Sequence, residues 1–307
     1  MKAITFILIS LFFTIHIQAQ VVETKNWCTS KCDMVGDELE NTNSIFETLL
    51  KDSSQINRHQ GAVLEFPLRI GLIQSGDSLS LDANLHLINQ AVDGLNKSFK
   101  DVGFSFFVAQ TDIIKSPLRI EELSENGYEP YDQFSDTYDI KDMISIYVFD
   151  YANDFCTITE SSISCGRTGG FSYILSNRTN NIVLSQFDLK DPKVVAHEMG
   201  HFFGLYHTFE EQQFGKDTFG LDDCQLVGDR ICDTPPDPGP IFEIYINYST
   251  CEMYGLDSGH NQEYKPLINN IMSYYKPCYM KEYSFTPIQR KVIKTAALSP
   301  LRKKFRR

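Results

Sequence analysis

Three histidines and a glutamate fall within residues 197–207 of this chain, in the order His-Glu-Met-Gly-His-Phe-Phe-Gly-Leu-Tyr-His. On a helix, His197 and His201 are four residues apart and share one face, so both imidazoles can reach a single metal ion. Glu198 then lies beside the ion without being needed as a ligand. This spacing predicts a zinc site with a general base next to it.

A glycine and a third histidine complete the pattern. Gly204 lets the chain leave the helix through a backbone conformation that is costly for other residues, which brings His207 round as the third ligand. Three protein ligands leave a fourth position open for water, as in catalytic rather than structural zinc sites. An amphipathic helix with three surface histidines is the alternative. Composition weakens it, because the chain has only seven histidines and one of them, His16, lies in the expected leader.

The helix that carries this motif has recognisable ends. Asp191 suits the N-cap and Pro192 suits the first helical position. Val195, Met199 and Phe202 follow at helical spacing and predict a buried face. A buried helix fixes the ligands on rigid backbone, as the geometry of a metal site requires.

The elements around this helix indicate an α+β domain. Strands are expected over residues 68–74, 104–108, 143–149 and 182–185. An apolar stripe from Leu81 to Phe99, which includes Leu85, predicts a long amphipathic helix facing the core. Thr286-Pro287-Ile288-Gln289 is a capping-box pattern that opens a last helix toward Leu298. The order of these elements predicts a mixed sheet backed by helices.

The ends of the chain and its charge limit the classes of function. Residues 1–19 have the features of a secretory signal peptide, and their apolar run is shorter than the roughly 20 residues of a membrane anchor. We therefore expect export without stable membrane insertion. With 28 basic and 40 acidic residues, the net charge of −12 argues against a nucleic-acid partner. The basic tail, residues 302–307, is expected to be a solvated end, with an electrostatic contact to a partner as the alternative.

Eight cysteines in an exported chain indicate disulfides. Their clustering favours local pairs. These are Cys28 with Cys32, Cys156 with Cys165, and pairs within the group Cys224, Cys232, Cys251 and Cys278. Three connectivities are possible in that group, and zinc binding by Cys224 and Cys232 is the alternative there. The irregular residues 208–270 would need such staples to be stable.

The histidine run, followed by Asn270-Ile271-Met272-Ser273-Tyr274, resembles the metzincin metalloproteases. Finer features are similar to the pappalysin family, especially its secreted microbial, ulilysin-like members. These features are Thr208-Phe209, the segment Gly228-Asp229-Arg230-Ile231-Cys232-Asp233-Thr234-Pro235, Phe285-Thr286 and Gln289. The resemblance covers roughly residues 64–298.

The resemblance implies roles for individual residues. The zinc ligands would be His197, His201 and His207, and Glu198 would be the base. Met272 matches the methionine of the Met-turn beneath the zinc. Tyr274 matches the tyrosine whose hydroxyl can approach the zinc and stabilise the oxyanion of the tetrahedral intermediate.

Two further sites come from the same resemblance. A structural calcium is implied near Asp229, Thr234 and the carbonyl of Cys232. Pro236 stands where some relatives place another acid, and turn formation is the alternative role for Asp229 and Asp233. The run Ile182-Val183-Leu184-Ser185 matches the family's edge strand, which would bind an extended substrate by main-chain pairing.

The implied fold is a metzincin-like zincin. A mixed sheet with long helices would form an upper subdomain over a smaller, irregular, disulfide-stapled lower one. Residues 61–307 would be the catalytic domain, and residues 20–60 a mature extension or a removed prosegment. In a prosegment, a free Cys28 or Cys32 thiolate could take the open zinc position, as an alternative to their disulfide.

The expected function is that of a secreted zinc endopeptidase, acting as a monomer on proteins or peptides. It would hydrolyse peptide bonds through a zinc-bound water with Glu198 as general base. The alternatives are an exported zinc-binding protein of the same fold without turnover and a zinc hydrolase of non-peptide amides.

Overall fold

The computed structural model of this chain describes residues 25–28, 36–51, 62–74, 81–120, 123, 128–149, 154–158, 163–176, 179–210, 224–239, 245–247, 249–250, 252–254, 256–257, 262–275 and 282–307. The expected signal peptide and three of the cysteines, Cys32, Cys251 and Cys278, lie outside these residues. In the described part of the chain, no helix combines the length and the apolarity needed to cross a bilayer.

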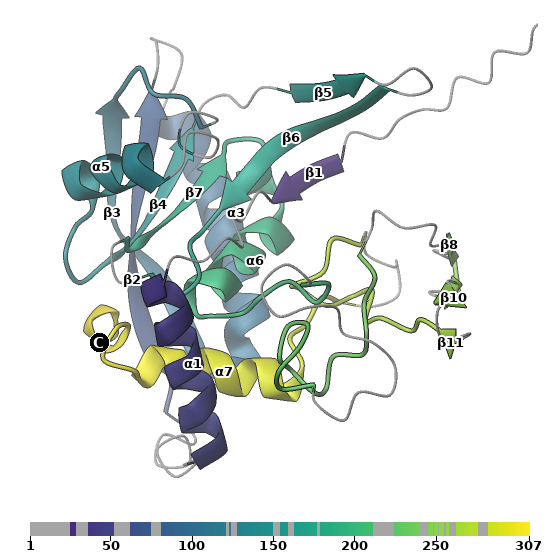
Figure 1. Cartoon of the computed structure of the whole chain (residues 1–307). Helices are drawn as coiled ribbons and strands as arrows, with labels where there is room; N and C mark the ends of the chain where they lie inside the picture. The colour runs from purple at the N-terminus through teal and green to yellow at the C-terminus, as the bar shows by residue number, and fades with distance from the viewer. Residues whose placement is uncertain are drawn as a thin grey trace, which may run out of the picture.

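A mixed seven-stranded sheet runs through the molecule in the order β1-β6-β7-β4-β2-β3, with β5 paired to β6 (Figure 1). Its strands are β1 (Lys25–Cys28), β2 (Leu64–Gln74), β3 (Phe104–Lys115), β4 (Ile144–Phe149), β5 (Asp154–Ile158), β6 (Ile163–Phe171) and β7 (Asn181–Ser185). Strands β7, β4, β2 and β3 are parallel, as are β1 and β6, whereas β6 is antiparallel to β7 and β5. The four strands expected from the sequence are confirmed.

Helices cover both faces of this sheet. They are α1 (Gly36–Lys51), α3 (Leu81–Phe99), α5 (Tyr128–Tyr138), α6 (Pro192–Phe202) and α7 (Pro287–Leu298), with short 3-10 turns η1 (Lys100–Val102), η2 (Asp188–Lys190) and η3 (Lys303–Phe305). Alternate residues of β4 point to opposite faces: Ile146 and Val148 join the apolar cluster of α1, α3, α6 and α7, and Tyr147 and Phe149 join that of α5. Helices α3 and α6 lie against each other on the first face (Figure 1).

The long helix expected from Leu81 to Phe99 is confirmed as α3. Ile88, Leu95 and Phe99 are buried in the core, as the apolar stripe indicates. Leu85 does not follow the expectation, since 41% of its surface is exposed. It lies in the second turn of the helix, before the face that meets the core.

The segment Ile182–Ser185 does not form an edge strand, and this expectation is wrong. In β7 all four residues pair with β4 on one side, and Val183 and Leu184 also pair with β6 on the other. The side chains of Ile182, Val183, Leu184 and Ser185 are all buried. Val183 and Leu184, which are paired on both edges, therefore offer no free main-chain groups to a substrate. The neighbour of β7 on that side is β6, and β1 pairs along the other edge of β6.

The basic tail is not a simple solvated end, because Arg302 and Phe305 are buried. The Arg302 guanidinium donates to the carbonyl oxygens of Phe202 and Ser176, at 3.0 Å each, and lies 4.0 Å from the Phe202 ring centroid. Phe202 ends helix α6, and the carbonyl end of a helix favours a cation. The tail therefore anchors the end of the helix that carries the histidines.

Helix α1, from the segment expected to be an extension or a prosegment, is part of the core. Ile45 and Phe46 are buried in the same apolar cluster as α6 and α7. Asn43 accepts a hydrogen bond of 2.6 Å from the Arg230 guanidinium, which also lies over the Phe46 ring. Figure 1 shows α1 lying across α7.

The described parts of residues 208–270 are largely irregular, as expected. They contain only two-stranded pairs: β8 (Tyr245–Asn247) with β9 (Glu252–Tyr254), and β10 (Leu256–Asp257) with β11 (Gln262–Glu263). Cys224 and Cys232 form a disulfide, which settles one pairing of that group. Cys156 and Cys165 are directly opposite in the β5–β6 register, and their disulfide stays a prediction.

Candidate metal centre

Helix α6 places two of the three histidines. The Asp191 carboxylate accepts a hydrogen bond of 2.9 Å from the Lys193 amide and so caps the helix, with Pro192 at its first turn. The predicted N-cap and the predicted proline in the first turn are both confirmed. His197 and His201 then lie one turn apart, and both are buried. The packing of α6 between α3 and the sheet holds their backbone in place.

The chain leaves the helix at Gly204 and returns His207 to the same point. Gly204 has a φ of +92°, a value that side-chain-bearing residues rarely adopt. A Cβ there would also lie 2.6 Å from Cδ1 of Leu175. Glycine is therefore required at this exit by backbone conformation and by space, and its predicted role is confirmed.

The three imidazoles converge through their Nε2 atoms. His201 Nε2 lies 3.1 Å from His197 Nε2 and 3.2 Å from His207 Nε2. Among the described residues this is the group of His, Cys, Asp or Glu side chains that could hold a metal ion. In a tetrahedral zinc site, Zn–N distances of about 2.0–2.1 Å place two ligand nitrogens about 3.3–3.4 Å apart. The histidines therefore fit zinc closely.

Main-chain carbonyls fix the tautomers of two of these imidazoles. His197 Nδ1 lies 2.8 Å from the carbonyl oxygen of Ile271, and His201 Nδ1 lies 2.7 Å from that of Leu205. Because a carbonyl can only accept, the proton must be on Nδ1. The Nε2 lone pairs therefore point to the shared centre, as ligation requires.

Burial keeps all three imidazoles neutral. Loss of hydration lowers the pKa of His197 and His207 well below the ordinary value, and the neighbouring imidazoles lower it further. Burial also lowers the pKa of His201 to about 4. Only neutral imidazoles bind metal, so at neutral pH the site needs to lose no proton from the histidines to accept an ion.

The expected Met-turn lies directly under the helix. Met272 is fully buried, and a Cβ placed on Gly200 would be 2.5 Å from its Sδ atom. The Met272 amide donates to Asn270 Oδ1 at 2.8 Å, which holds the turn together. The preceding carbonyl, of Ile271, is the one that orients His197. Met272, which follows the histidine run by 65 positions in the sequence, thus lies directly against the helix that carries His197 and His201.

Tyr274 brings a hydroxyl to the histidines. Its oxygen lies 3.0 Å from His207 Nε2. Phe209, to which the sequence assigned no role, stacks on the His207 ring with centroids 4.8 Å apart and planes 7° from parallel, and it also meets the Tyr274 ring edge-on. His207 and Tyr274 are therefore held side by side by an aromatic neighbour.

Glu198 directly follows His197 on helix α6, and its side chain lies against strand β6. Its side chain is fully buried. A Cβ on Gly170 of β6 would be 3.3 Å from Glu198 Cγ and 2.7 Å from Leu184 Cδ2, so only glycine fits there. Strand β6 thus borders Glu198. In the β1–β6 pair, Cys28 is the register partner of this glycine.

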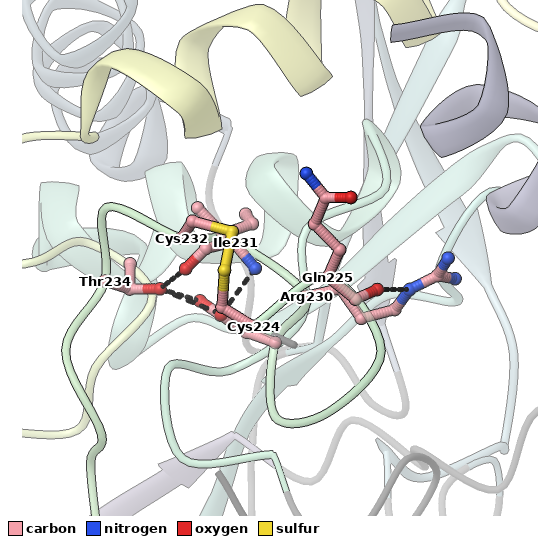
Figure 2. Close-up of a disulfide and its surroundings, with 7 residues drawn as sticks. Cys224, Gln225, Arg230, Ile231, Cys232 and Thr234 are labelled. Atoms are coloured by element: carbon pink, nitrogen blue, oxygen red, sulfur yellow. Dashed lines mark hydrogen bonds between the residues drawn. A yellow bond between two sulfur atoms is a disulfide. The ribbon is translucent and has the colours of Figure 1, made fainter. Parts of the chain in front are cut away.

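The residues assigned to calcium form a closed turn. The Asp229 carboxylate is buried and accepts hydrogen bonds from the Ile231 amide at 3.0 Å and from the Thr234 hydroxyl at 2.8 and 2.9 Å. Figure 2 shows Thr234 beside the Cys224–Cys232 disulfide that closes this loop. Asp233 instead accepts from the Thr286 hydroxyl and the Ile288 amide at the start of α7. Asp229 therefore has the turn-forming role that was the alternative to calcium, whereas Asp233 binds the start of α7 instead.

Sequence reasoning missed two polar residues near the site, Asp237 and Lys193. Asp237 accepts a hydrogen bond from the Thr208 hydroxyl, next to His207. Lys193 Nζ donates to the carbonyl oxygen of Tyr275, next to Tyr274. Lys193 stands four residues before His197, a spacing that could have placed it on the ligand face. The sequence contains no such signal for Asp237.

Comparison with known proteins gives relatives of one kind. An extracellular metalloprotease of Arthroderma gypseum is 25% identical over 184 residues, which cover 54% of this chain and 54% of that protein. Extracellular metalloproteases of Colletotrichum graminicola and Arthroderma benhamiae are 31% and 33% identical, over 45% and 32% of this chain and 36% and 28% of theirs. The matched part thus spans about half of the first relative and less of the other two.

A family comparison covers more of the molecule. The profile of metallo-peptidase family M12 named Reprolysin_5 matches residues 77–284. The matched range begins just before α3 and includes the histidine helix and residues 270–274. Together with the histidine geometry, it supports a catalytic zinc held by His197, His201 and His207. By this match, the chain belongs to metallo-peptidase family M12.

Proposed function

We propose that this protein is a secreted zinc endopeptidase of the pappalysin type, which hydrolyses peptide bonds in proteins or peptides. The observation that carries the proposal is the convergence of three buried, neutral imidazoles, with His201 Nε2 3.1 and 3.2 Å from the Nε2 atoms of His197 and His207. Two of the three stand on helix α6, which also carries Glu198. The family membership supports it. The pappalysin assignment within the family rests on the sequence features around Gly228–Pro235 and Phe285–Gln289.

The proposed chemistry divides among three groups. When bound, zinc lowers the pKa of water toward neutrality and polarises a carbonyl oxygen. Glu198, as general base, accepts the proton of the attacking water and passes it to the departing amine. The Tyr274 hydroxyl, 3.0 Å from His207 Nε2, donates a hydrogen bond to the oxyanion that develops on the substrate carbonyl.

Secretion is part of the proposal. It is supported by the signal-like residues 1–19 and by relatives that are named extracellular. We propose residues 61–307 as the catalytic domain, acting as a monomer. Calcium at Asp229, Cys232 and Thr234 stays a prediction of the resemblance. In the structure, both oxygens of the Asp229 carboxylate accept hydrogen bonds within the turn.

The base tests this proposal most simply. Residues 20–307 are expressed under oxidising conditions as wild type and as the Glu198→Ala variant, and zinc content and cleavage of denatured casein are measured. Because Glu198 moves a proton without holding the ion, we expect one zinc per chain in both and a loss of about 100- to 10,000-fold in cleavage by the variant. Glu282→Ala removes an exposed carboxylate paired with Lys97 and should change neither quantity.

The outcomes separate the candidate functions. Zinc in both proteins with cleavage in neither would favour a zinc-binding protein without turnover. Cleavage by the Glu198→Ala variant at the wild-type rate would rule out the proposed base. Absence of zinc from the wild type would contradict the metal site itself.

A further inference from the structure

A single buried carboxylate joins the two segments that carry His207 and Tyr274. Asp237 Oδ2 accepts a hydrogen bond of 2.6 Å from the Thr208 hydroxyl, and Asp237 Oδ1 accepts one of 2.5 Å from the Tyr275 hydroxyl. Thr208 directly follows His207, and Tyr275 directly follows Tyr274. The Gly239 amide donates a third hydrogen bond to Oδ1, at 2.9 Å. A carboxylate bound at three points can hold both segments at fixed positions.

A lysine ties the same tyrosine to the histidine helix. Lys193, in the first turn of α6, donates from Nζ to the main-chain carbonyl of Tyr275 at 2.8 Å. Its ammonium also lies 4.3 Å from the centroid of the Tyr283 ring. Tyr275 is thus held at its carbonyl by α6 and at its phenol by Asp237. The side chains Lys193, Tyr275, Asp237 and Thr208 therefore form a continuous strap from the helix to the third histidine.

The strap joins two segments, one with His207 and one with Tyr274, whose main-chain hydrogen bond is long. The main-chain hydrogen bond between these segments, from the Thr208 amide to the Met272 carbonyl, has a length of 3.3 Å. The separation that matters is the 3.0 Å between the Tyr274 hydroxyl and His207 Nε2. Misplacement of a catalytic group by about 1 Å can cost a hundredfold in rate. Burying a carboxylate is also costly unless donors surround it, and here three donors do.

We propose that Asp237 is a positioning residue that sets the separation of the His207 imidazole and the Tyr274 hydroxyl, one arm through Thr208 and the other through Tyr275. Its two arms have different consequences. The Thr208 arm governs how well His207 completes the metal site. The Tyr275 arm governs where the Tyr274 hydroxyl meets the substrate oxyanion. The second consequence rests on the proposed peptidase function, whereas the first does not.

The two arms can be removed one at a time. Thr208→Val deletes one hydroxyl at nearly constant volume, and Tyr275→Phe deletes the other while keeping the ring. Each variant of residues 20–307 is measured for zinc affinity by competition with a chromophoric chelator, and for kcat and KM on a peptide substrate. Partners of metal ligands typically contribute 10- to 100-fold to affinity or activity.

The expected results differ between the arms. Thr208→Val should weaken zinc binding by about 10-fold or more. Tyr275→Phe should lower kcat by about 10-fold at saturating zinc, with zinc affinity and KM within about twofold of wild type. Asp237→Asn, which keeps the shape but lacks one acceptor oxygen, should show both effects.

Two control variants separate the proposed effects from a general loss of stability. Tyr131→Phe removes a buried phenol that hydrogen-bonds Asn181 on the other face of the sheet, and Thr295→Val removes a hydroxyl that donates to the Lys291 carbonyl in α7. Neither should change zinc affinity or kcat. If Thr208→Val and Tyr275→Phe behave like these controls, the positioning role is wrong.

Failure of the proposed function gives a different pattern. A wild type that binds zinc but cleaves nothing would contradict the peptidase proposal. The affinities of Thr208→Val and Asp237→Asn would then still decide the inference: weaker zinc binding supports the Thr208 arm, and unchanged binding overturns it.

Discussion

At the scale of single residues, the neutral charge state of the three imidazoles decides whether they can bind a metal ion. Buried neutral histidines are ready to bind a cation, but they also make the metal-free fold sensitive to acid. His201 has its pKa lowered to about 4 by burial, while an unfolded chain takes up the same proton near pH 6.5. The pKa values of His197 and His207 are shifted in the same direction.

This difference predicts a pH-dependent stability of the metal-free protein. Between about pH 6.5 and 4 the unfolded state binds more protons than the folded state, so the free energy of unfolding falls as the pH falls. We expect on the order of 1 kcal/mol per pH unit for each imidazole. Urea unfolding of chelator-treated protein from about pH 7.5 to 5 measures it.

His201→Gln provides the comparison for that measurement, because other groups also titrate in this range. The variant should lose stability with acid less steeply than the wild type. Parallel pH dependences for the two proteins would show that His201 takes up its proton in the folded state.

Residues that act through a local motif could be predicted, and those that act through long-range contacts could not. The spacing of His197, Glu198, His201 and His207 follows from helix geometry, and Gly204 from the need to leave the helix. Asp237 has no comparable signal. Its partners Thr208 and Tyr275 stand 29 and 38 positions away, and only the folded chain brings them together.

At the scale of elements, the sequence likewise predicts some features of the strands and not others. β7 was recognisable as a strand, and its continuous apolar run Ile182-Val183-Leu184 is typical of a strand buried on both faces. Such a run indicates an interior position, which the structure shows, whereas the resemblance implied an edge strand. β6, with the sequence Ile-Ser-Cys-Gly-Arg-Thr-Gly-Gly-Phe, was not predicted, because its glycines and polar residues give no strand pattern.

The N-terminal elements β1 and α1 make different contacts, and we expect their removal to have different results. β1 pairs along the outer edge of β6, which borders Glu198, so an extended substrate would compete with it for that edge. A chain starting at residue 36 should keep its melting temperature and cleave casein faster than residues 20–307. Equal cleavage rates for the two chains would contradict an obstructive role for β1.

A chain starting at residue 62 is the matched comparison. It also lacks α1, whose Ile45 and Phe46 are buried in the main core, and each such side chain is worth roughly 1.5–3 kcal/mol. This chain should melt well below the one starting at residue 36. Similar melting temperatures would mean that α1 is dispensable, as expected of a removable prosegment.

At the scale of the whole molecule, helices pack on both faces of the sheet, and the C-terminal tail anchors the helix that carries two of the histidines. α3, α6 and α7 share the apolar cluster under the metal centre, while α5 closes the opposite face. Arg302 links the tail to the end of α6, although a basic sequence alone indicated a solvated end. The periodic elements could be predicted because they bury apolar faces. The anchoring of the tail could not, because it depends on two carbonyl oxygens far away in sequence.

The most direct measurement for the central claim is a zinc titration of the whole exported chain. Residues 20–307 are stripped with a chelator and titrated with zinc, and bound zinc and casein cleavage are followed together. Cleavage should be absent at first, rise in proportion to bound zinc and level off at one zinc per chain, while His201→Gln binds little zinc and stays inactive. Full cleavage by the metal-free protein, or none at one zinc per chain, would contradict the account.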